Sequence, residues 1–361
     1  MREEEALRET RARIDAIDRE LLKLINERAT CAVEIGRLKR VAGAVTMLYR
    51  PEREAEVLRR IRDTNPGPLH DDDAVRIVRE IMSACLSLEE PLRVAYLGPE
   101  GTYTHAAAMK HFGGAARFEP VPGIDDIVHA VETGQTHFGI LPIENSLEGP
   151  VNQSHDAIQA SSLTLCGEVV LSVHHQLLSK ATDLASIRSV HAHAQALAQC
   201  RHWLDTHCPH AERISMSSNA EAARYVLERG DAAAIAGTIA AERYGLPALA
   251  ANIEDQADNT TRFLVLGKEA VGPTGDDVTS LVFGTPNKAG ALCEVLQAFA
   301  RAGISMSRIQ SRPLRRGTWE YLFFVDIGGH QTDPAVSAAL AELGQHTSVC
   351  RVLGSYPRAV L

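Results

Sequence analysis

The chain has 361 residues, of which 45% are hydrophobic, and its formal net charge is -9 at pH 7. This length allows roughly two to four domains with sizeable cores, and the negative charge argues against a general role in binding nucleic acids or membrane surfaces. No apolar run reaches transmembrane length, and the acidic start MREEEALRET lacks the basic and then apolar order of a signal peptide. We therefore expect a cytoplasmic protein.

The cysteines and histidines give no sign of a metal site. Seven cysteines are scattered from Cys31 to Cys350 without a CxxC pair, which indicates reduced thiols packed as small apolar groups. The histidines between His191 and His210, with Cys200 and Cys208 among them, match no standard zinc spacing. We expect neither a metal nor a cofactor.

The stretch Leu7–Lys39 has no proline and consists mostly of good helix formers, so it predicts one long helix. Residues spaced alternately four and three apart along this stretch form a heptad seam. A heptad seam normally faces a partner helix and is apolar, yet three of its members, Arg11, Arg28 and Lys39, are cations. One buried arginine can extend to water or pair with Asp18 or Glu34, but three unpaired buried cations would be costly. The pattern therefore predicts an anionic ligand. The heptad seam consists of Leu7, Arg11, Ile14, Asp18, Leu21, Ile25, Arg28, Ala32, Ile35 and Lys39.

Helix geometry indicates how the cations could share this ligand. At about 1.5 Å per residue, Arg28 and Lys39 lie roughly 16 Å apart, and their long side chains can converge on one small molecule. Arg11 lies about 25 Å from Arg28, which is too far within one straight helix. We therefore expect Arg11 to come from the other subunit of an antiparallel, two-fold dimer.

Two shorter helices are predicted to follow a loop at Val41–Tyr49. The second helix opens at Arg50-Pro51-Glu52-Arg53-Glu54 and ends at residues 65–68. The third is capped by the acidic run Asp71–Asp73 and fades at residues 89–91. Its predicted apolar face consists of Val75, Val78, Ile81, Met82 and Cys85. A three-helix unit of this size is too thin to stand alone, which again predicts a dimer.

The strings RxRIDxIDxxLLxLINER, AVEIGRLK and RPERE in this segment resemble the all-helical class of chorismate mutase. The resemblance implies a domain at residues 1–91 that converts chorismate to prephenate. Chorismate is a dianion that rearranges without a nucleophile, so cations that hold its carboxylates and stabilise the ether oxygen suffice. Arg11 and Arg28 suit the carboxylates and Lys39 suits the ether oxygen. The site would combine Arg11 of one subunit with Arg28, Lys39, Arg53, Glu54 and Glu89 of the other.

Two positions depart from the mutase pattern. Arg50 stands where some members carry Asp, and Glu89 stands where many members carry Gln. A carboxylate donates a hydrogen bond to the ether oxygen only when it is protonated. The mutase rate is therefore expected to depend on pH.

Strands and helices are predicted to alternate through residues 92–268, which indicates a parallel-sheet α/β fold, with two lobes and a cleft. A glycine turn at residues 98–104 could receive an anion but lacks the lysine of a phosphate loop. The strand Phe138–Pro142 brings Glu144-Asn145-Ser146 to its carboxyl end, where such sheets bind ligands. The other predicted elements are strands at Arg93–Leu97, residues 163–173, Val190, Ala232–Ala236 and Thr260–Gly267, and helices at residues 125–134, Ala194–His207 and Asn219–Arg229.

The motifs YLGPEGTYTHAAA, GILPIENSLEGPVNQS and NTTRFLVLG resemble the prephenate dehydratase domain, which implies a periplasmic-binding-protein-like fold. By this resemblance Thr261 is the principal catalytic residue, with Arg262 and Phe263 beside it and Asn145 and Gln199 assisting. Prephenate loses carbon dioxide and hydroxide, so a hydroxyl that donates a hydrogen bond to the departing group is the expected role of Thr261. Arg262 either binds a substrate carboxylate or braces the loop.

One position departs from the dehydratase pattern. Ala192 stands where relatives often have Ser, so either this hydroxyl is dispensable or Ser218 replaces it.

After a linker at residues 270–277, the predicted order of elements is βαββαβ, the ferredoxin-like arrangement, at residues 278–357. The strings Gly290-Ala291-Leu292-Cys293 and Gln310-Ser311-Arg312-Pro313 resemble the two signatures of the phenylalanine-sensing ACT domain, although Val is usual at Cys293 and Glu at Gln310. The alternative is a purely structural dimerisation domain. The resemblance implies that L-phenylalanine binds to Gly290, Ala291, Leu292, Ser311, Arg312 and Pro313.

The three segments together predict a bifunctional enzyme that converts chorismate to prephenate and prephenate to phenylpyruvate, under feedback inhibition by L-phenylalanine. We expect a homodimer or a higher homo-oligomer. Two alternatives are a catalytically silent sensor of aromatic metabolites and an enzyme that uses arogenate in place of prephenate.

Overall fold

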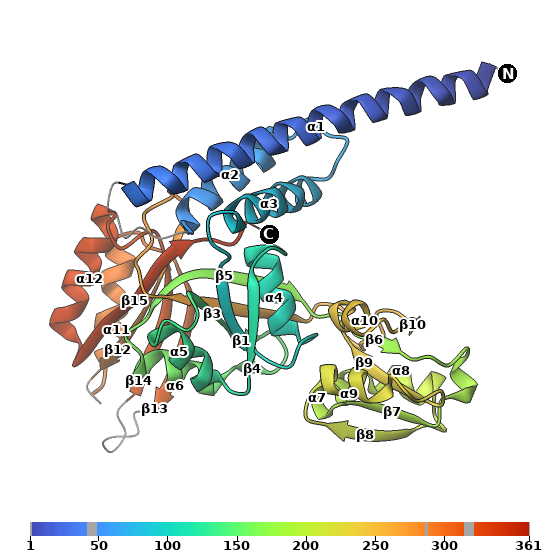
Figure 1. Cartoon of the computed structure of the whole chain (residues 1–361). Coiled ribbons are helices and arrows are strands. Elements are labelled where there is room, and N and C mark those ends of the chain that lie inside the picture. Colours follow the sequence, from blue (N-terminus) through green and yellow to red (C-terminus); the bar gives the residue numbers. More distant parts are fainter. Residues whose placement is uncertain (1, 42–48, 286–287, 314–320, 361) are drawn as a thin grey trace. The chain divides into compact units, whose positions relative to one another are not determined.

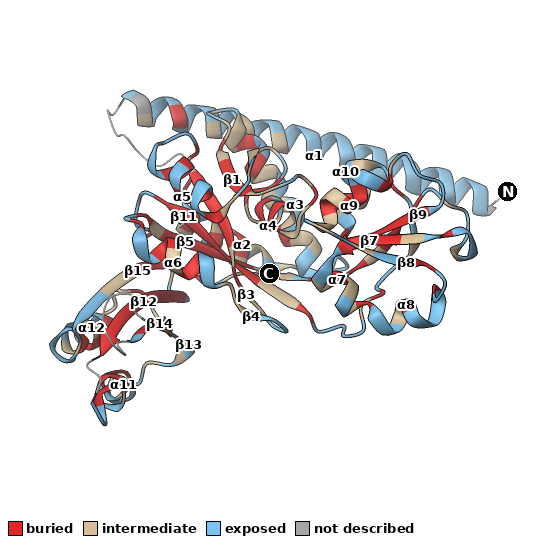
Figure 2. Cartoon of the chain, turned by 90° about the horizontal axis from the view of Figure 1, so that it is seen from below, coloured by how far each residue is buried: buried red, intermediate tan, exposed pale blue. Residues whose placement is uncertain are grey.

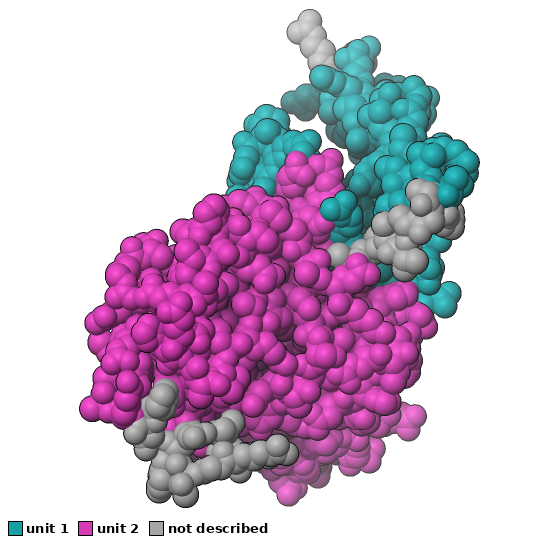
Figure 3. All heavy atoms as spheres, turned by 90° about the vertical axis from the view of Figure 1, so that its left-hand side faces the viewer, with its two compact units in different colours: residues 1–50, 58–92, 112–117 teal, residues 51–57, 93–111, 118–361 magenta. Residues whose placement is uncertain are grey.

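Figure 1 shows a computed structural model of the chain, which describes residues 2–41, 49–285, 288–313 and 321–360. The chain divides into two compact units (Figure 3). The first comprises residues 1–50, 58–92 and 112–117, and the second comprises residues 51–57, 93–111 and 118–361. None of the helices in the described ranges is both long and apolar enough to cross a membrane.

The predicted helices at the N-terminus are confirmed. They are α1 (Arg2–Val41), α2 (Pro51–Thr64) and α3 (Asp71–Ser87). Helix α1 extends beyond the predicted stretch at both ends, and most of the predicted loop after it lies outside the described residues. Three aspartates fill the first turn of α3, but its N-cap is His70 rather than an aspartate. The predicted apolar face of α3 is correct, because Val75 and Cys85 are buried.

The heptad seam of α1 is largely exposed in the single chain, as the pale colour of this helix in Figure 2 shows. Leu7, Ile14, Leu21 and Ile35 are each about half exposed. Gly36 is the buried residue near its end, where a Cβ would lie 2.6 Å from Oε2 of Glu89. Helix α1 therefore packs closely at this point, whereas most of its apolar side chains are left uncovered by the described part of the chain.

The first lobe of the second unit is built on a mixed sheet of order β2-β1-β3-β11-β5, with β4 paired to β3. Strands β1 and β3 are parallel, but β11 is antiparallel to both β3 and β5. The prediction of a parallel sheet was therefore wrong for this lobe. The strands are β1 (Arg93–Leu97), β2 (Arg117–Val121), β3 (Phe138–Asn145), β4 (Gly149–Pro150), β5 (Thr164–Ser172) and β11 (Thr260–Gly267), and the helices are α4 (Tyr103–Phe112), α5 (Ile124–Glu132) and α6 (Asn152–Ala160).

The second lobe has a mixed sheet of order β10-β6-β9-β7-β8. Its central strand β9 has the sequence AAAIA and is buried throughout, which fits a strand covered on both faces. The prediction of two lobes is confirmed. The strands are β6 (Gln176–Leu178), β7 (Ser189–His193), β8 (Glu212–Met216), β9 (Ala232–Ala236) and β10 (Ala248–Ala250), and the helices are α7 (Ala194–Gln199), α8 (Arg201–His207), α9 (Asn219–Val226), α10 (Thr238–Tyr244) and the short η1 (Leu184–Ser186).

The helix predicted at Ala194–His207 is two helices, α7 and α8, separated at Cys200. The carboxylate of Asp255 accepts hydrogen bonds from the backbone N–H groups of His202 and Trp203, at 2.9 and 3.1 Å. A carboxylate in this position satisfies the free N–H groups of a new helix and favours its N-terminus. The Asp255 N–H in turn donates to the Gln199 carbonyl at 2.7 Å. Asp255, which is distant in the sequence, therefore caps the N-terminus of α8 and hydrogen-bonds to the last residue of α7.

The last part of the second unit confirms the predicted βαββαβ order. Its antiparallel sheet has the order β13-β14-β12-β15, and one face packs on α11 and α12 through a core that includes Phe283 and Phe299. Residues 314–320, between β13 and β14, lie outside the described residues. The elements are β12 (Asp277–Thr285), α11 (Ala291–Arg301), β13 (Met306–Pro313), β14 (Tyr321–Gly328), α12 (Pro334–His346) and β15 (Val349–Pro357).

The other face of this four-stranded sheet packs against the first lobe. Phe324 and Tyr356 share one hydrophobic core with Leu165 and Leu264 of the lobe. A Cβ on Gly354 would lie 2.1 Å from the carbonyl oxygen of Leu165, so β15 approaches β5 at a distance that only glycine allows. The four-stranded sheet and the sheet of the first lobe are therefore packed together at backbone distance.

Candidate functional site

A cavity of about 300 Å³ lies between the two lobes of the second unit. Its lining combines the N-terminus of α4, the carboxyl end of β3, the start of β11, the end of α7 and the N-terminus of α9. Among the described residues that line it, there is no aspartate, glutamate, lysine or arginine. The groups that can contact a ligand there are hydroxyls, amides, imidazoles and the N–H groups of helix ends.

Asn145 and Thr261 face each other across the β3–β11 pair and both line this cavity. The Asn145 Oδ1 accepts hydrogen bonds from the backbone N–H groups of Leu147 and Glu148, at 3.1 and 3.0 Å. These two donors fix which way the amide points, so Nδ2 donates to the Thr261 Oγ1 at 2.9 Å. Because the hydroxyl oxygen accepts from Asn145, the hydroxyl proton of Thr261 is left to point into the cavity.

The same amide orders a second group in the cavity. Asn145 also donates to Oδ1 of Asn259 at 2.8 Å, and Asn259 donates to Oε1 of Gln199 at 3.4 Å. This leaves Nε2 of Gln199 buried and without a hydrogen-bond partner in the described part of the chain. A buried, unpaired N–H donor is costly unless a ligand satisfies it. Gln199 is therefore prepared to receive an oxygen atom of a ligand.

The sequence motifs did not single out His175, which also lines the cavity. Its Nε2 lies 2.8 Å from Oε1 of Gln199, and its Nδ1 lies 2.9 Å from the Tyr103 hydroxyl. Burial lowers the pKa of His175, which favours the neutral imidazole. The sequence offers one signal for this residue: the polar pair His174-His175 follows a buried strand.

Two helix N-termini meet at the cavity. Thr102 and Tyr103 stand at the start of α4, and Ser218 and Asn219 stand at the start of α9. Helix N-termini attract anions through their free N–H groups. Ala192 is fully buried in the core of the second lobe, whereas Ser218 lines the cavity and caps α9 by accepting from the Glu221 N–H. Ser218 therefore brings a hydroxyl to the cavity, whereas Ala192 does not line it.

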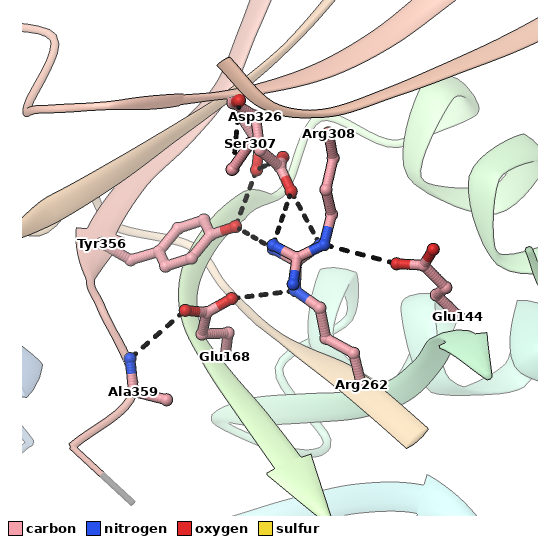
Figure 4. Close-up of polar contacts among 9 residues, drawn as sticks. Glu144, Glu168, Arg262, Ser307, Arg308, Asp326, Tyr356 and Ala359 are labelled. Atoms are coloured by element: carbon pink, nitrogen blue, oxygen red, sulfur yellow. Dashed lines mark hydrogen bonds and ion pairs between the residues drawn. The ribbon is translucent and has the colours of Figure 1, made fainter. Parts of the chain in front are cut away.

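Arg262 and Phe263 do not line the cavity. Phe263 is 1% exposed and belongs to the interior of the first lobe. Arg262 projects from the opposite face of β11, where its guanidinium contacts Glu168, Asp326 and Tyr356 (Figure 4). Successive residues of a strand point to opposite faces, which explains why Thr261 and Arg262 part. These contacts are those of a bracing residue, which is one of the two roles predicted for Arg262.

The predicted mutase residues in the first unit lie on α1 and after α3. Helix α1 is continuous from Arg2 to Val41, so Arg11 and Arg28 are about 25 Å apart on one straight element. Both arginines are exposed and Lys39 is partly buried. Oε2 of Glu89 is buried and has no hydrogen-bond partner among the described residues, and Glu89 packs on Gly36, one turn before Lys39.

Arg53 and Glu54 occupy the first turn of α2, which falls in the second unit. Arg53 is exposed and pairs with Glu56 three residues later, whereas Glu54 is partly buried. A pair of this kind on a helix surface contributes little to stability, so Arg53 can leave Glu56 at low cost.

The predicted effector residues lie at the start of α11 and on the edge strand β13. Gly290 is the N-cap of α11 with a φ of 85°, a backbone conformation that favours glycine. Ala291 is buried, Leu292 is partly buried, and Ser311 and Pro313 are exposed. Arg312 points the other way and pairs with Asp156 of the first lobe at 2.6 Å.

The described ranges hold no group of three His, Cys, Asp or Glu side chains that is arranged to bind a metal ion. All seven cysteines are free thiols, and Cys85, Cys166, Cys200 and Cys208 are buried.

Comparison with known proteins assigns each segment to a family. The chorismate mutase type II family matches residues 10–90, the prephenate dehydratase family matches residues 94–271, and the ACT domain matches residues 279–345. These matches follow the order of the helices, the two lobes and the βαββαβ part. They confirm the three resemblances found in the sequence motifs.

A relative that matches the whole chain agrees with this assignment, and two solved structures are similar to most of it. A bifunctional chorismate mutase/prephenate dehydratase of Pseudomonas aeruginosa is 48% identical over 365 residues, which is 100% of both chains. A solved prephenate dehydratase from Arthrobacter aurescens in complex with L-Phe is 37% identical, with a TM-score of 0.68, over 74% of this chain and 90% of that chain. A solved protein titled as a novel type of quorum quenching acylase is 31% identical, with a TM-score of 0.69, over 74% of this chain and 98% of that chain.

The identity to the Pseudomonas aeruginosa enzyme covers the whole chain. The mutase, dehydratase and ACT matches follow one another along it. This chain therefore belongs to the family of bifunctional chorismate mutase/prephenate dehydratases and is an enzyme with both activities.

Proposed function

We propose that the two reactions use two separate sites and that L-phenylalanine inhibits the second reaction. The dehydratase site is the cavity between the lobes, and the mutase site forms on α1 when two chains pair. The observation that carries the first assignment is the Asn145–Thr261 hydrogen bond, which leaves the hydroxyl proton of Thr261 to face the cavity.

In the dehydratase reaction, Thr261 gives a hydrogen bond to the hydroxyl that leaves prephenate, while the substrate loses carbon dioxide and gains an aromatic ring. Gln199 Nε2 and the N-termini of α4 and α9 hold the two carboxylates. Neutral donors suit the carboxylate that departs as carbon dioxide, because an ion pair would stabilise the charged ground state and not the transition state, in which that charge disperses. This fits a lining that lacks lysine and arginine among its described residues.

In the mutase reaction, Arg11 and Arg28 hold the two carboxylates of chorismate, while Lys39 and protonated Glu89 stabilise the breaking ether oxygen. Arg53 and Glu54 complete the site. The supporting observation is that Oε2 of Glu89 is buried, without a hydrogen-bond partner in the described ranges, and that Glu89 packs on Gly36, one turn from Lys39. A group of this kind is prepared to contact a ligand.

The occupant proposed for the exposed seam of α1 is α1 of a second copy, in antiparallel orientation. Four large apolar residues of the seam are about half exposed over an unbroken helix of 40 residues. A length of about 60 Å, at 1.5 Å per residue, lets Arg11 of one copy reach Arg28 of the other.

Regulation is proposed from the third segment. A relative of known structure, the Arthrobacter aurescens prephenate dehydratase, is described in complex with L-Phe. In this chain Gly290, Ala291 and Leu292 of α11, with Ser311, Arg312 and Pro313 of β13, are the proposed contacts. Binding of L-phenylalanine would shift the population of open and closed cleft states, to the extent that it binds one state more tightly.

The role of Thr261 can be tested by reversing its hydrogen bond. In Asn145→Asp, a carboxylate oxygen replaces Nδ2 and accepts the proton of Thr261, which then no longer faces the substrate. We expect dehydratase kcat to fall about 100- to 1,000-fold in Asn145→Asp and in Thr261→Val. Steady-state assays with prephenate measure this, and mutase activity serves as the control for folding. A wild-type kcat in either variant would contradict the assignment.

The role of Glu89 predicts a pH dependence. Only the protonated carboxyl can donate to the ether oxygen, so mutase kcat/KM should rise as the pH falls. Glutamine donates at every pH, and Glu89→Gln should therefore flatten this profile. Initial rates of chorismate loss in both proteins decide the matter, and a wild-type rate that does not change with pH would contradict the role.

The shared mutase site predicts complementation between inactive chains. Arg11→Ala and Arg28→Ala should each be nearly inactive alone. In a mixed dimer, one site lacks both arginines and the other keeps both, so random exchange of subunits should restore about a quarter of the wild-type mutase activity. Dehydratase activity of each variant is the control. A mixture no more active than its components would exclude a site shared across the dimer.

L-Phenylalanine should inhibit dehydratase turnover of the whole chain, and D-phenylalanine, which places its amine differently, should inhibit much less. Rates of phenylpyruvate formation at increasing concentrations of each enantiomer measure this. Turnover that is unchanged at saturating L-phenylalanine would refute the regulatory proposal and leave the two catalytic assignments untouched.

A further inference from the structure

The two residues that precede and follow the catalytic pair face the four-stranded sheet. Strands β3 and β11 pair Asn145 with Thr261 and, one step away, Glu144 with Arg262. The first pair lines the cavity between the lobes, and the second lines a smaller cavity, of about 60 Å³, against the four-stranded sheet. A single pair of strands therefore presents Asn145 and Thr261 on one face and the charged residues Glu144 and Arg262 on the other.

Arg262 is held from both sides of this boundary. Its Nε donates to Glu168 Oε2 on β5 at 2.8 Å, and its guanidinium lies 2.7 Å from Asp326 Oδ2 on β14 (Figure 4). It also donates to the Tyr356 hydroxyl on β15 at 3.0 Å. The side chains of Arg262 and Asp326 are only 6% and 11% exposed, so solvent screens this pair weakly.

A second arginine connects the same sheet to the strand that carries Asn145. Arg308 on β13 lies 3.4 Å from Glu144 Oε2 and 3.7 Å from Asp326 Oδ2 (Figure 4). Arg308 is two residues before Gln310, where the proposed effector motif begins. Asp326 is therefore shared by two arginines. Arg262 directly follows Thr261 in the chain, and Arg308 contacts Glu144, which directly precedes Asn145.

The network also has room to rearrange. The 60 Å³ cavity is lined by Glu144, Arg262, Arg308 and Asp326, and it exceeds the space that one water molecule needs. The contacts of Arg308 are longer than those of Arg262, and its side chain is 38% exposed. Arg308 can thus change partners while Arg262 stays buried.

We propose that Arg262 is a positioning residue of the dehydratase site, and that Asp326 makes the placement of Thr261 and Asn145 depend on the position of the four-stranded sheet. The second part rests on the proposed inhibition by L-phenylalanine, which would supply the signal. Movement of β13 and β14 alters the hold of Asp326 on both arginines, and these transmit the change to β11 and β3. The path consists of direct contacts.

Asp326→Asn tests this proposal. Two arginines face three carboxylates in the network, so the substitution leaves the charges balanced and the variant is expected to fold. We expect dehydratase kcat to fall about tenfold because Thr261 is misplaced, with KM for prephenate within about twofold of wild type. The concentration of L-phenylalanine for half inhibition should rise about tenfold or more.

Arg351→Met is the matched control. Arg351 on β15 donates to the carbonyl oxygens of Ile158 and Ser161 at 2.6 and 2.8 Å, so it joins the same sheet to the same lobe outside the network. We expect this variant to keep the wild-type kcat and inhibition. An Asp326→Asn variant that changes neither quantity more than Arg351→Met would overturn the proposal.

Arg308→Met keeps the proposal testable if Asp326→Asn does not fold, because Arg308 is partly exposed and its loss leaves Arg262 paired. Its kcat and inhibition should change in the same direction as in Asp326→Asn, by less. Wild-type values of both would overturn the proposal. If the wild-type enzyme is itself not inhibited by L-phenylalanine, the regulatory proposal fails, and the comparison of kcat between Asp326→Asn and Arg351→Met still decides the positioning role.

Discussion

Burying a guanidinium group is costly unless carboxylates lie close to it, and this constraint applies to arginines in both units of the chain. In the second unit the chain supplies them, because Glu168 and Asp326 flank the buried Arg262. On the seam of α1, Arg11 and Arg28 stand where an apolar helix face would meet a partner. There the carboxylates are proposed to belong to the substrate, so binding the dianion and pairing two chains become one event.

The two proposed sites handle anionic substrates in opposite ways. The mutase site uses full positive charges, which suits a reaction in which both carboxylates persist from substrate to product. The dehydratase cavity uses hydroxyls, amides and helix ends. In that reaction one carboxylate leaves as carbon dioxide, so a strong ion pair would favour the substrate over the transition state. The same family of metabolites is thus met by charges in one site and by dipoles in the other.

The pairing of β11 with β3 connects the proposed catalytic residues to the proposed regulatory contacts in the second unit. Alternation along these strands directs Thr261 and Asn145 to the cavity and Arg262 and Glu144 to the four-stranded sheet. The close approach of Gly354 to Leu165 and the shared core around Tyr356 hold that sheet against the lobe. Because protein interiors are densely packed, a displacement at one face of such strands is felt at the other.

The sequence by itself determined the elements and most of their order, since helices, strands and turns follow from local periodicity, proline and glycine. The heptad seam with its three cations and the βαββαβ order were readable in this way, whereas the role predicted for Thr261 followed only from the resemblance to prephenate dehydratases. The tertiary structure alone decided that the lobes have mixed sheets, that Asp255 splits a predicted helix to place Gln199, and that His175 joins the cavity. It also decided that Arg262 points away from Thr261, into a cluster with Asp326. These features depend on contacts between residues far apart in the chain, about which local periodicity carries no information.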